Sequence, residues 1–185
     1  MTRSTLLDDL IKRTESVKQE VLQFSDVPVE MLNQRKAPDS WSALECLEHL
    51  NRYGRFYVPE IETRINSAKV SENEEYKSGW LGNYFALSML PGENGKLNKM
   101  KTFKSMNPLL QVLNKDVIDE FVQQQDRLLN LLQSARRVDL AKVKTGISIS
   151  KWIKLQLGDT FRVVVYHNQR HVVQARKALP QLAHN

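Results

Sequence analysis

The strongest constraint on the fold is a set of apolar positions that recur every three or four residues over four long segments. These segments are residues 4–24, 42–65, 114–136 and 158–178. This spacing is typical of helices that bury one face and expose the other. Helices of this length must pack their apolar faces against one another. The pattern therefore predicts an all-α protein, a four-helix bundle.

Start and stop signals refine the predicted helices. Ser42 and Glu45 form a capping box, in which a hydroxyl and a carboxylate each satisfy a free backbone N–H at the start of the second helix. Pro59 lacks a backbone N–H and is expected to bend or interrupt that helix. For the last helix we expect Asp159 as the N-cap and Pro180 as the stop.

The connections are less regular than the helices. Residues 67–108 are rich in Gly and Pro, and this long connection between the second and third helices indicates a lid or a crossover. Residues 80–89 within it have the character of a short helix. Residues 143–156 are expected to form either a short strand or an extended connector. Three aromatic residues in these segments either line a pocket or pack in the core, and we favour the core: Trp80, Tyr84 and Trp152. Trp41 is expected to pack over the start of the second helix.

Length and composition limit the class of protein. A chain of 185 residues fits one domain, residues 1–185, with a buried core. No apolar run approaches the length of a membrane span, and Asp8 and Asp9 do not fit a signal peptide. The single Cys excludes an intramolecular disulfide and any multi-cysteine zinc site, and it suits a reducing compartment. We therefore expect a cytoplasmic protein with no membrane partner.

The net charge of +6 invites a nucleic-acid interpretation. The basic residues are scattered, however, and the densest run, Lys96 to Lys104, holds four Lys in nine positions. No recognition helix or basic-aromatic stripe accompanies this run, so nucleic acid is the least supported partner. A solvated loop is the simpler interpretation, and attraction of an acidic substrate or cofactor is the alternative.

Three histidines form the candidate chemical site. His167 and His171 are four residues apart, which places both rings on one helical face one turn apart. His49 lies at the edge of the apolar stripe of the second helix. Three neutral imidazoles suit zinc or nickel and leave a coordination position open for water or substrate. The alternative is that these are core histidines, because an isolated pair at this spacing is weak evidence for a metal. His184, near the end of the chain, is not expected to take part.

Two passages, residues 38–50 (PDSWSALECLEHL) and 157–174 (LGDTFRVVVYHNQRHVVQ), resemble the second-helix opening and the last helix of DinB-like proteins. Residues 99–108 (KMKTFKSMNP) are similar to the basic loop of the YfiT-like members, the metal-dependent hydrolases. The resemblance implies a four-helix bundle of up-down-down-up topology with a long loop between helices two and three. It implies a divalent metal, commonly zinc or nickel, held by His49, His167 and His171. It also implies a homodimer.

Five further residues are candidates for the same site. Glu45 is either a general base or only a capping residue, with capping favoured. Tyr53 would donate a hydrogen bond to a developing anion, or else lie at the core edge. Gln174 would orient the ring of His171. Arg170 would bind a substrate carboxylate or make a surface ion pair. Cys46 is a fourth ligand, a redox-sensitive thiol or a small buried residue, and burial is favoured.

The leading functional hypothesis is a metal-dependent enzyme of hydrolase or S-transferase type that acts on a small-molecule substrate. The ion would activate water or a low-molecular-weight thiol, and the basic run would attract an anionic thiol cofactor. Thiol transfer is slightly favoured because the sequence shows no unambiguous general base. The alternative is a non-catalytic bundle that binds a metal or a small ligand in a stress-related role.

Overall fold

The computed structural model describes residues 1–90, 92 and 101–179, and it is mostly helical. The described residues form six α-helices and two β-strands. The α-helices are α1 (Arg3–Leu22), α2 (Val29–Leu32), α3 (Ala43–Asn66), α4 (Trp80–Met89), α5 (Asp116–Ser134) and α6 (Leu157–Ala178). The strands are β1 (Lys144–Ile147) and β2 (Ser150–Gln156). Short 3-10 turns are η1 (Gln23–Asp26), η3 (Lys104–Met106) and η4 (Ala135–Arg137).

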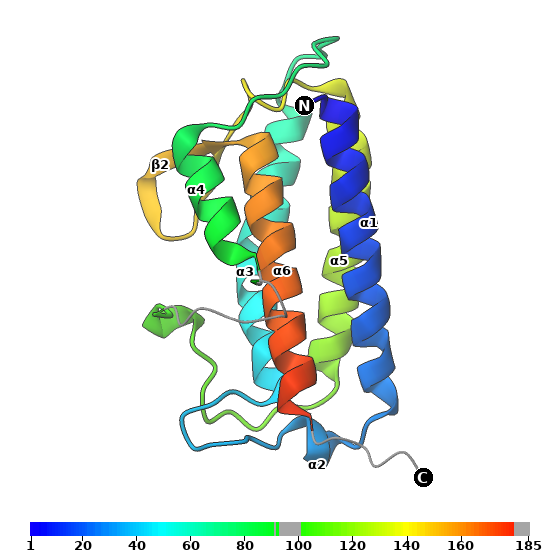
Figure 1. Ribbon diagram of the computed structural model, residues 1–185, viewed down its shortest axis with the longest axis vertical. Helices are drawn as coiled ribbons and strands as arrows, with labels where there is room; N and C mark the ends of the chain where they lie inside the picture. Colours follow the sequence, from blue (N-terminus) through cyan, green and yellow to red (C-terminus); the bar gives the residue numbers. More distant parts are fainter. Residues whose placement is uncertain (91, 93–100, 180–185) are drawn as a thin grey trace.

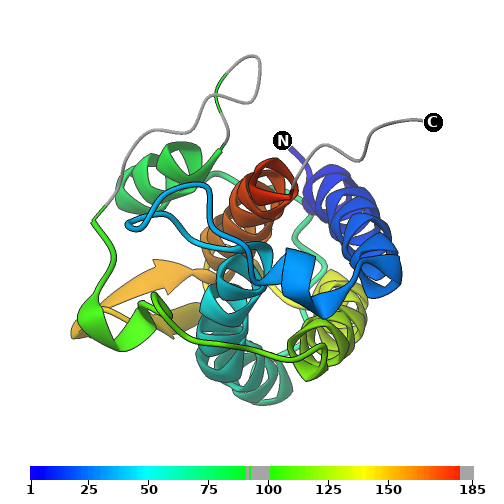
Figure 2. The same cartoon turned by 90° about the horizontal axis from the view of Figure 1, so that it is seen from below.

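The four long helices are those that the apolar periodicity predicts, and they lie side by side (Figures 1 and 2). In Figure 1, α1 and α6 run from top to bottom, whereas α3 and α5 run from bottom to top. Each of α1 and α3 packs against both α5 and α6. Residues far apart in the sequence can therefore meet along the α3–α6 contact.

The interior is divided into two apolar clusters with polar side chains between them. One cluster includes Leu10, Ile61 and Phe161, and the other includes Leu44 and Phe121. Buried polar residues occupy the intervening positions on all four long helices, namely Thr14, His49, Asn51, Gln124, Gln125, Asn168 and His171. The apolar clusters stabilise the helix contacts on both sides of this polar layer. The position of the layer along the helix axes is therefore fixed by the packing.

The start of α3 confirms the predicted capping box, and the helix then continues through Pro59. Ser42 Oγ accepts from the Glu45 N–H, and the Glu45 carboxylate accepts from the Ser42 N–H. The expected interruption at Pro59 does not occur, since α3 is one helix from Ala43 to Asn66. Pro59 has no N–H to donate to the carbonyl of Arg55, four residues earlier. Because Pro59 lies on the exposed side of α3, water can bind that carbonyl instead.

The prediction of Asp159 as the N-cap of the last helix was wrong, because the N-cap is Gln156. Asp159 is the third residue of α6, and its buried carboxylate accepts hydrogen bonds from the Tyr76 hydroxyl and the Gly79 N–H at the start of α4. A Cβ at Gly82 would lie 2.3 Å from this carboxylate, so glycine permits the close approach of α4 to α6. Asp159 thus anchors α4.

Residues 143–156 form a hairpin, which settles the choice between strand and connector. β1 and β2 are antiparallel, with Thr145 opposite Leu155 and an irregularity after Gly146. The predicted short helix at residues 80–89 is α4. The expectation that its aromatic residues pack in the core was wrong: Trp80 is 83% exposed and Tyr84 66% exposed. The small residues Gly82 and Ala86 face inward instead. Trp152 on β2 is also exposed, at 94%.

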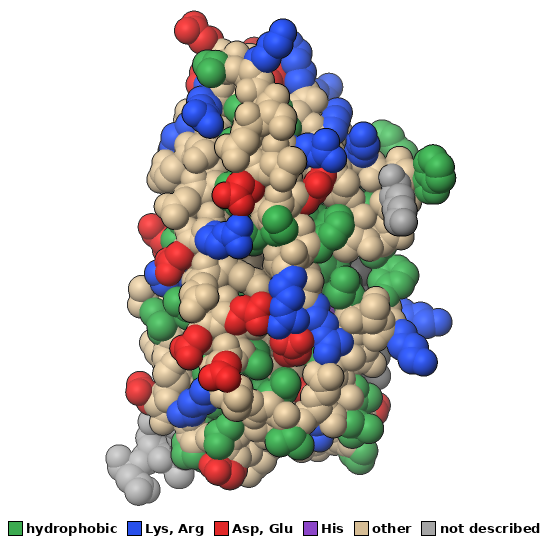
Figure 3. Space-filling view, turned by 180° about the vertical axis from the view of Figure 1, so that it is seen from behind, with side chains coloured by type: hydrophobic (Ala, Val, Ile, Leu, Met, Phe, Trp, Pro, Cys, Tyr) green, Lys and Arg blue, Asp and Glu red, His purple; other side chains and the backbone are tan. Residues whose placement is uncertain are grey.

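The surface carries charges of both signs. On the face shown in Figure 3, acidic and basic side chains are interspersed. Ion pairs between α3 and α5 contribute to this mixture, among them Arg55 with Glu120 and Arg127 with Glu62. Across the described part of the chain, no helix combines the length and apolar character that crossing a membrane would require.

Candidate metal centre

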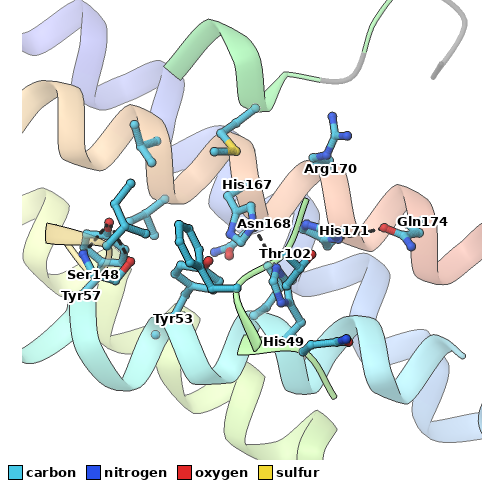
Figure 4. Close-up of a pocket in the computed structure, with 18 of the residues that line it drawn as sticks. His49, Tyr53, Tyr57, Thr102, Ser148, His167, Asn168, Arg170, His171 and Gln174 are labelled. Atoms are coloured by element: carbon cyan, nitrogen blue, oxygen red, sulfur yellow. Dashed lines mark hydrogen bonds between the residues drawn. The ribbon is translucent and has the colours of Figure 1, made fainter. Parts of the chain in front are cut away.

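His49 of α3 meets His167 and His171 of α6 at the α3–α6 contact (Figure 4). The Nε2 atoms of His49 and His167 are 3.2 Å apart, and one ring nitrogen from each of the three residues lies within 4.8 Å of the others. His49 and His171 are buried, and His167 is half-buried. The structure therefore brings the three predicted histidines together.

The spacing of these nitrogens fits a single metal ion. Two imidazole nitrogens on one tetrahedral zinc ion, each about 2.0–2.1 Å from it, are about 3.3 Å apart. The 3.2 Å between the His49 and His167 Nε2 atoms is close to this value. Two facing lone pairs at this distance repel each other unless a proton or a cation lies between them. The donor set and its geometry thus suit a first-row divalent ion.

Hydrogen bonds orient two of the three rings. The His49 Nδ1–H donates to the Met106 carbonyl at 2.7 Å, and a carbonyl can only accept. The proton is therefore on Nδ1, and the Nε2 lone pair points toward the other histidines. The His171 Nδ1 lies 2.9 Å from Gln174 Oε1, which fixes the second ring in the same tautomer. Gln174 thus occupies the orienting position predicted from the sequence.

The electrostatic environment keeps the three rings neutral. Burial lowers the pKa of His49 to about 4, assisted by the charge of Arg52 and opposed by the hydrogen bond to Met106. Burial likewise lowers the pKa of His167 and His171 well below the usual range, and the neighbouring histidines and Arg170 add to this effect. Neutral imidazole is the form that binds a metal, so the site requires no deprotonation at neutral pH.

Two aromatic side chains lie against the histidines. The Trp41 ring centroid is 4.6 Å from that of His49 and 5.6 Å from that of His171. Tyr53 contacts His49 and His167, with centroids 5.0 and 4.8 Å away. Burial raises the pKa of Tyr53 to about 12, so its hydroxyl stays protonated and remains a hydrogen-bond donor. The two aromatic rings therefore cover part of the histidine cluster.

The histidines open onto a cavity of about 660 Å³ (Figure 4). Its lining includes Tyr53 and Trp41 beside the histidines, and it extends along α3 to Tyr57. A volume of this size is typical of small-molecule sites. The site therefore combines three donors that could hold a metal ion with adjoining space for a ligand.

The sequence model of the DinB superfamily matches residues 11–175 of the chain. The chain belongs to the DinB superfamily. The match contains all three histidines of the cluster, so the resemblance seen in the sequence is confirmed at the level of the family. No curated protein and no solved structure shows significant similarity to this DinB protein.

Glu45 does not line the cavity of this DinB protein. Its carboxylate accepts two hydrogen bonds from Arg35, at 2.7 and 2.8 Å, besides those from the Ser42 and Gln111 N–H groups. Burial alone would raise the pKa of Glu45, but these hydrogen bonds and the Arg35 charge hold it below the usual value. Both carboxylate oxygens are thus engaged in holding the start of α3 to the neighbouring loops.

Cys46 and Arg170 are both buried but in different places. Cys46 lies in the apolar cluster that contains Leu44, outside the cavity lining, and burial raises the pKa of its thiol. Arg170 lines the cavity and is only 4% exposed, which does not fit the surface ion pair considered from the sequence. Only Arg170 of these two is placed to meet a ligand.

The predicted basic run falls partly outside the described residues. Lys96 and Lys99 lie outside them, as does His184. Lys101 lines the cavity and Lys104 is exposed. The anion-attracting role of the run therefore stays a prediction.

Sequence reasoning missed two groups of the site. Trp41 was expected only to cover the start of α3, yet its ring lies on two histidines and its Nε1–H donates to Asn107 Oδ1 at 3.0 Å. The second group is the Met106 carbonyl. The Trp-Ser start of α3 marked Trp41 as a family feature, but no local signal identifies a backbone carbonyl as the partner of His49.

Proposed function

We propose that this DinB protein is a metal-dependent enzyme that activates water or a low-molecular-weight thiol against a small electrophilic substrate. His49, His167 and His171 would hold the ion, zinc or nickel by the chemistry of three imidazoles. The observation that carries the proposal is the convergence of three buried, neutral histidines on the wall of a cavity. Among the described residues no further Cys, Asp or Glu joins the group, so a coordination position would stay open.

When bound, such an ion lowers the pKa of a coordinated water or thiol and so supplies a nucleophile at neutral pH. The protein's own residues prepare the surroundings. The Met106 carbonyl and Gln174 hold the rings of His49 and His171, and the Trp41 ring lies against both rings. The Tyr53 hydroxyl would donate a hydrogen bond to negative charge that develops on the substrate, and the contact of its ring with His49 supports this role.

The lining of the cavity favours a thiol over water as the nucleophile. Even on a metal ion, water ionises only near pH 7, so a base would assist hydrolysis, and the one carboxylate among the described lining residues is the exposed Asp39. Glu45 has both oxygens engaged elsewhere. A thiol coordinated to the ion would be deprotonated outright and would depend less on such a base, so S-transfer is the reaction that we place first.

We also propose that the four long helices make a four-helix bundle of up-down-down-up topology. The opposite directions of α1 and α6 against α3 and α5 in Figure 1 support this arrangement. A homodimer and a cytoplasmic location stay predictions from the family resemblance and from the single buried Cys46.

The test is a comparison of zinc- or nickel-loaded protein with metal-free protein and with His167→Ala, using small thiols with chlorodinitrobenzene and, separately, simple esters. We expect metal-dependent turnover that His167→Ala abolishes while circular dichroism shows a folded protein. In loaded Tyr53→Phe, turnover should fall by about a hundredfold with unchanged metal content. Equal rates with and without metal would contradict the proposal. Unfolding upon metal removal would indicate a structural metal instead.

A further inference from the structure

The cavity extends well beyond the three histidines. From His49 to Tyr57 is eight positions along α3, a rise of about 12 Å. In Figure 4, Tyr57 and Ser148 lie at one end, His171 and Gln174 lie at the other, and Tyr53 lies between them. The whole length belongs to one cavity of about 660 Å³. A molecule bound at the histidines would therefore have room to extend toward the hairpin.

Few of the residues that line the cavity are charged. Among the described lining residues they are Asp39, Lys101 and Arg170. Arg170 precedes His171, and Asp39 is two residues before Trp41, which lies on His49. Lys101 precedes Thr102, which Figure 4 shows beside His49 and His171. All three residues are thus close in the chain to residues of the histidine end, and in Figure 4 the Arg170 side chain points away from His49.

The opposite end is apolar. We call it the apolar arm, defined by Tyr57, Phe85, Leu128, Ile147 and Val164. It is built from α3, α4, α5, α6 and the hairpin, so five elements converge on it. Between the apolar arm and the histidines lie neutral amides, and Asn168 Nδ2 there donates to Gln125 Oε1 at 2.9 Å. No charge among the described residues of the arm would pair with a charged ligand.

The end wall of the apolar arm has its polar groups satisfied internally. The Ser148 N–H donates to the Tyr57 hydroxyl at 3.3 Å, and the Ser148 Oγ lies 3.4 Å from the same oxygen. These contacts hold the hairpin tip against α3. Space lined by apolar groups with satisfied polar neighbours gives water few partners and favours an apolar ligand.

We propose that the apolar arm binds the uncharged, apolar portion of an elongated substrate whose polar, reactive end lies at the three histidines. This inference rests on the proposed function for the reactive end. The substrate class is an amphiphilic small molecule with an alkyl or aryl chain. Chains that carry a charge are disfavoured, because the arm would bury that charge without a partner.

The first experiment measures ligand binding to the apolar arm and does not depend on a bound metal. Binding of the neutral dye N-phenylnaphthylamine to the purified protein is followed by its fluorescence. We expect saturable one-to-one binding that Val164→Trp, which fills the arm, weakens by about tenfold or more. Val173→Trp is the matched control, because Val173 is half-buried on the same helix but does not line the cavity. If Val164→Trp does not fold, Phe85→Lys replaces it by placing a charge in the arm.

The second experiment tests whether one ligand can occupy the histidine site and the apolar arm at the same time. Acetohydroxamate and its butano, hexano and octano homologues are titrated into zinc-loaded protein by calorimetry. If their chains enter the apolar arm, affinity should rise by about fourfold for each methylene buried. Val164→Trp should bind acetohydroxamate like the wild type but lose the gain with chain length.

The outcomes separate this inference from the proposed function. Dye binding that is blocked only in the arm variants, with chain-length-dependent hydroxamate affinity, supports both. Acetohydroxamate binding with no gain for longer chains, and equal dye binding in all variants, overturns the apolar arm while the open metal site stands. Arm-dependent dye binding without any hydroxamate binding supports the arm as a ligand site and overturns the metal-dependent function.

Discussion

The Nε2 atoms of His49 and His167 lie 3.2 Å apart, although 118 positions separate the two residues in the chain. Packing of α3 against α6 determines this distance, and apolar clusters above and below hold the two helices in place. Burying several imidazoles is unfavourable unless their lone pairs find a partner. A shared divalent ion would provide that partner for all three rings at once.

The hydrogen bond from His171 Nδ1 to Gln174 predicts a loss of metal affinity in Gln174→Leu. Groups that orient a metal-bound histidine typically contribute a factor of about 10–100 in affinity. We expect a loss of this size in a competition titration against a zinc chelator, with little change in thermal stability of the metal-free protein. Gln169→Leu is the control, because Gln169 accepts from Arg13 rather than from a histidine. Equal affinity in the two variants would contradict the orienting role.

The depressed pKa of His49 predicts an acid-sensitive fold in the metal-free protein. The folded-state pKa is about 4, whereas an unfolded histidine has 6.5, so the unfolded state binds more protons between these values. The free energy of unfolding should therefore fall as pH drops from 6.5 to 4, by about 3 kcal/mol for His49 alone. Urea unfolding across this range, in metal-free wild type and His49→Gln, measures the difference. Identical pH dependence in the two proteins would refute the assignment.

The contacts of Glu45 predict that its substitution lowers the stability of the fold rather than the rate of a reaction. Glu45→Ala removes both the capping-box acceptor and the partner of Arg35, and we expect it to destabilise the fold by about 3 kcal/mol. Turnover per folded molecule should change little in Glu45→Gln. Glu62→Ala, which breaks an exposed pair with Arg127, should cost about 0.5 kcal/mol in the same denaturant titration. A stable Glu45→Gln variant that loads metal but has no turnover would instead identify Glu45 as the base.

The close approach of α4 to α6 predicts that Gly82→Ala loosens α4. The added methyl group would lie within 2.5 Å of three atoms of Asp159, whose carboxylate binds the start of α4. We expect a loss of about 1–3 kcal/mol in stability and weaker dye binding, because α4 supplies Phe85 and Met89 to the cavity. In Gly146→Ala, the nearest atom is 3.4 Å from the new methyl group, and stability should be nearly unchanged. Equal thermal unfolding midpoints for the two variants would show that α4 accommodates the added methyl group, and would contradict this prediction.

Local patterns in the sequence predicted the parts of the fold that depend on local physics. The apolar stripes located α1, α3, α5 and α6, since each helix must bury one face. Ser42 and Glu45 located the start of α3 because both partners of a capping box lie within four residues. The spacing of His167 and His171 placed two rings together for the same reason.

Local sequence patterns did not predict the contacts between residues that are far apart in the chain. The Met106 carbonyl meets His49 only because the chain returns across α3 after a long connection. Asp159 resembles a helix cap, yet its partners are at the start of α4, eighty positions earlier in the chain. Trp80 is of a type often found in protein cores, but it faces outward. The small residues of α4, Gly82 and Ala86, face inward instead and allow α4 to pack closely. Such outcomes depend on which surfaces meet in three dimensions.

The most direct test of the metal centre is metal content by mass spectrometry on tag-free protein, measured for the wild type, His49→Ala and His184→Ala. We predict close to one zinc or nickel ion per chain in the wild type and in His184→Ala, and almost none in His49→Ala. No bound ion in the wild type, even after reloading with each metal, or equal content in His49→Ala, would contradict the three-histidine site.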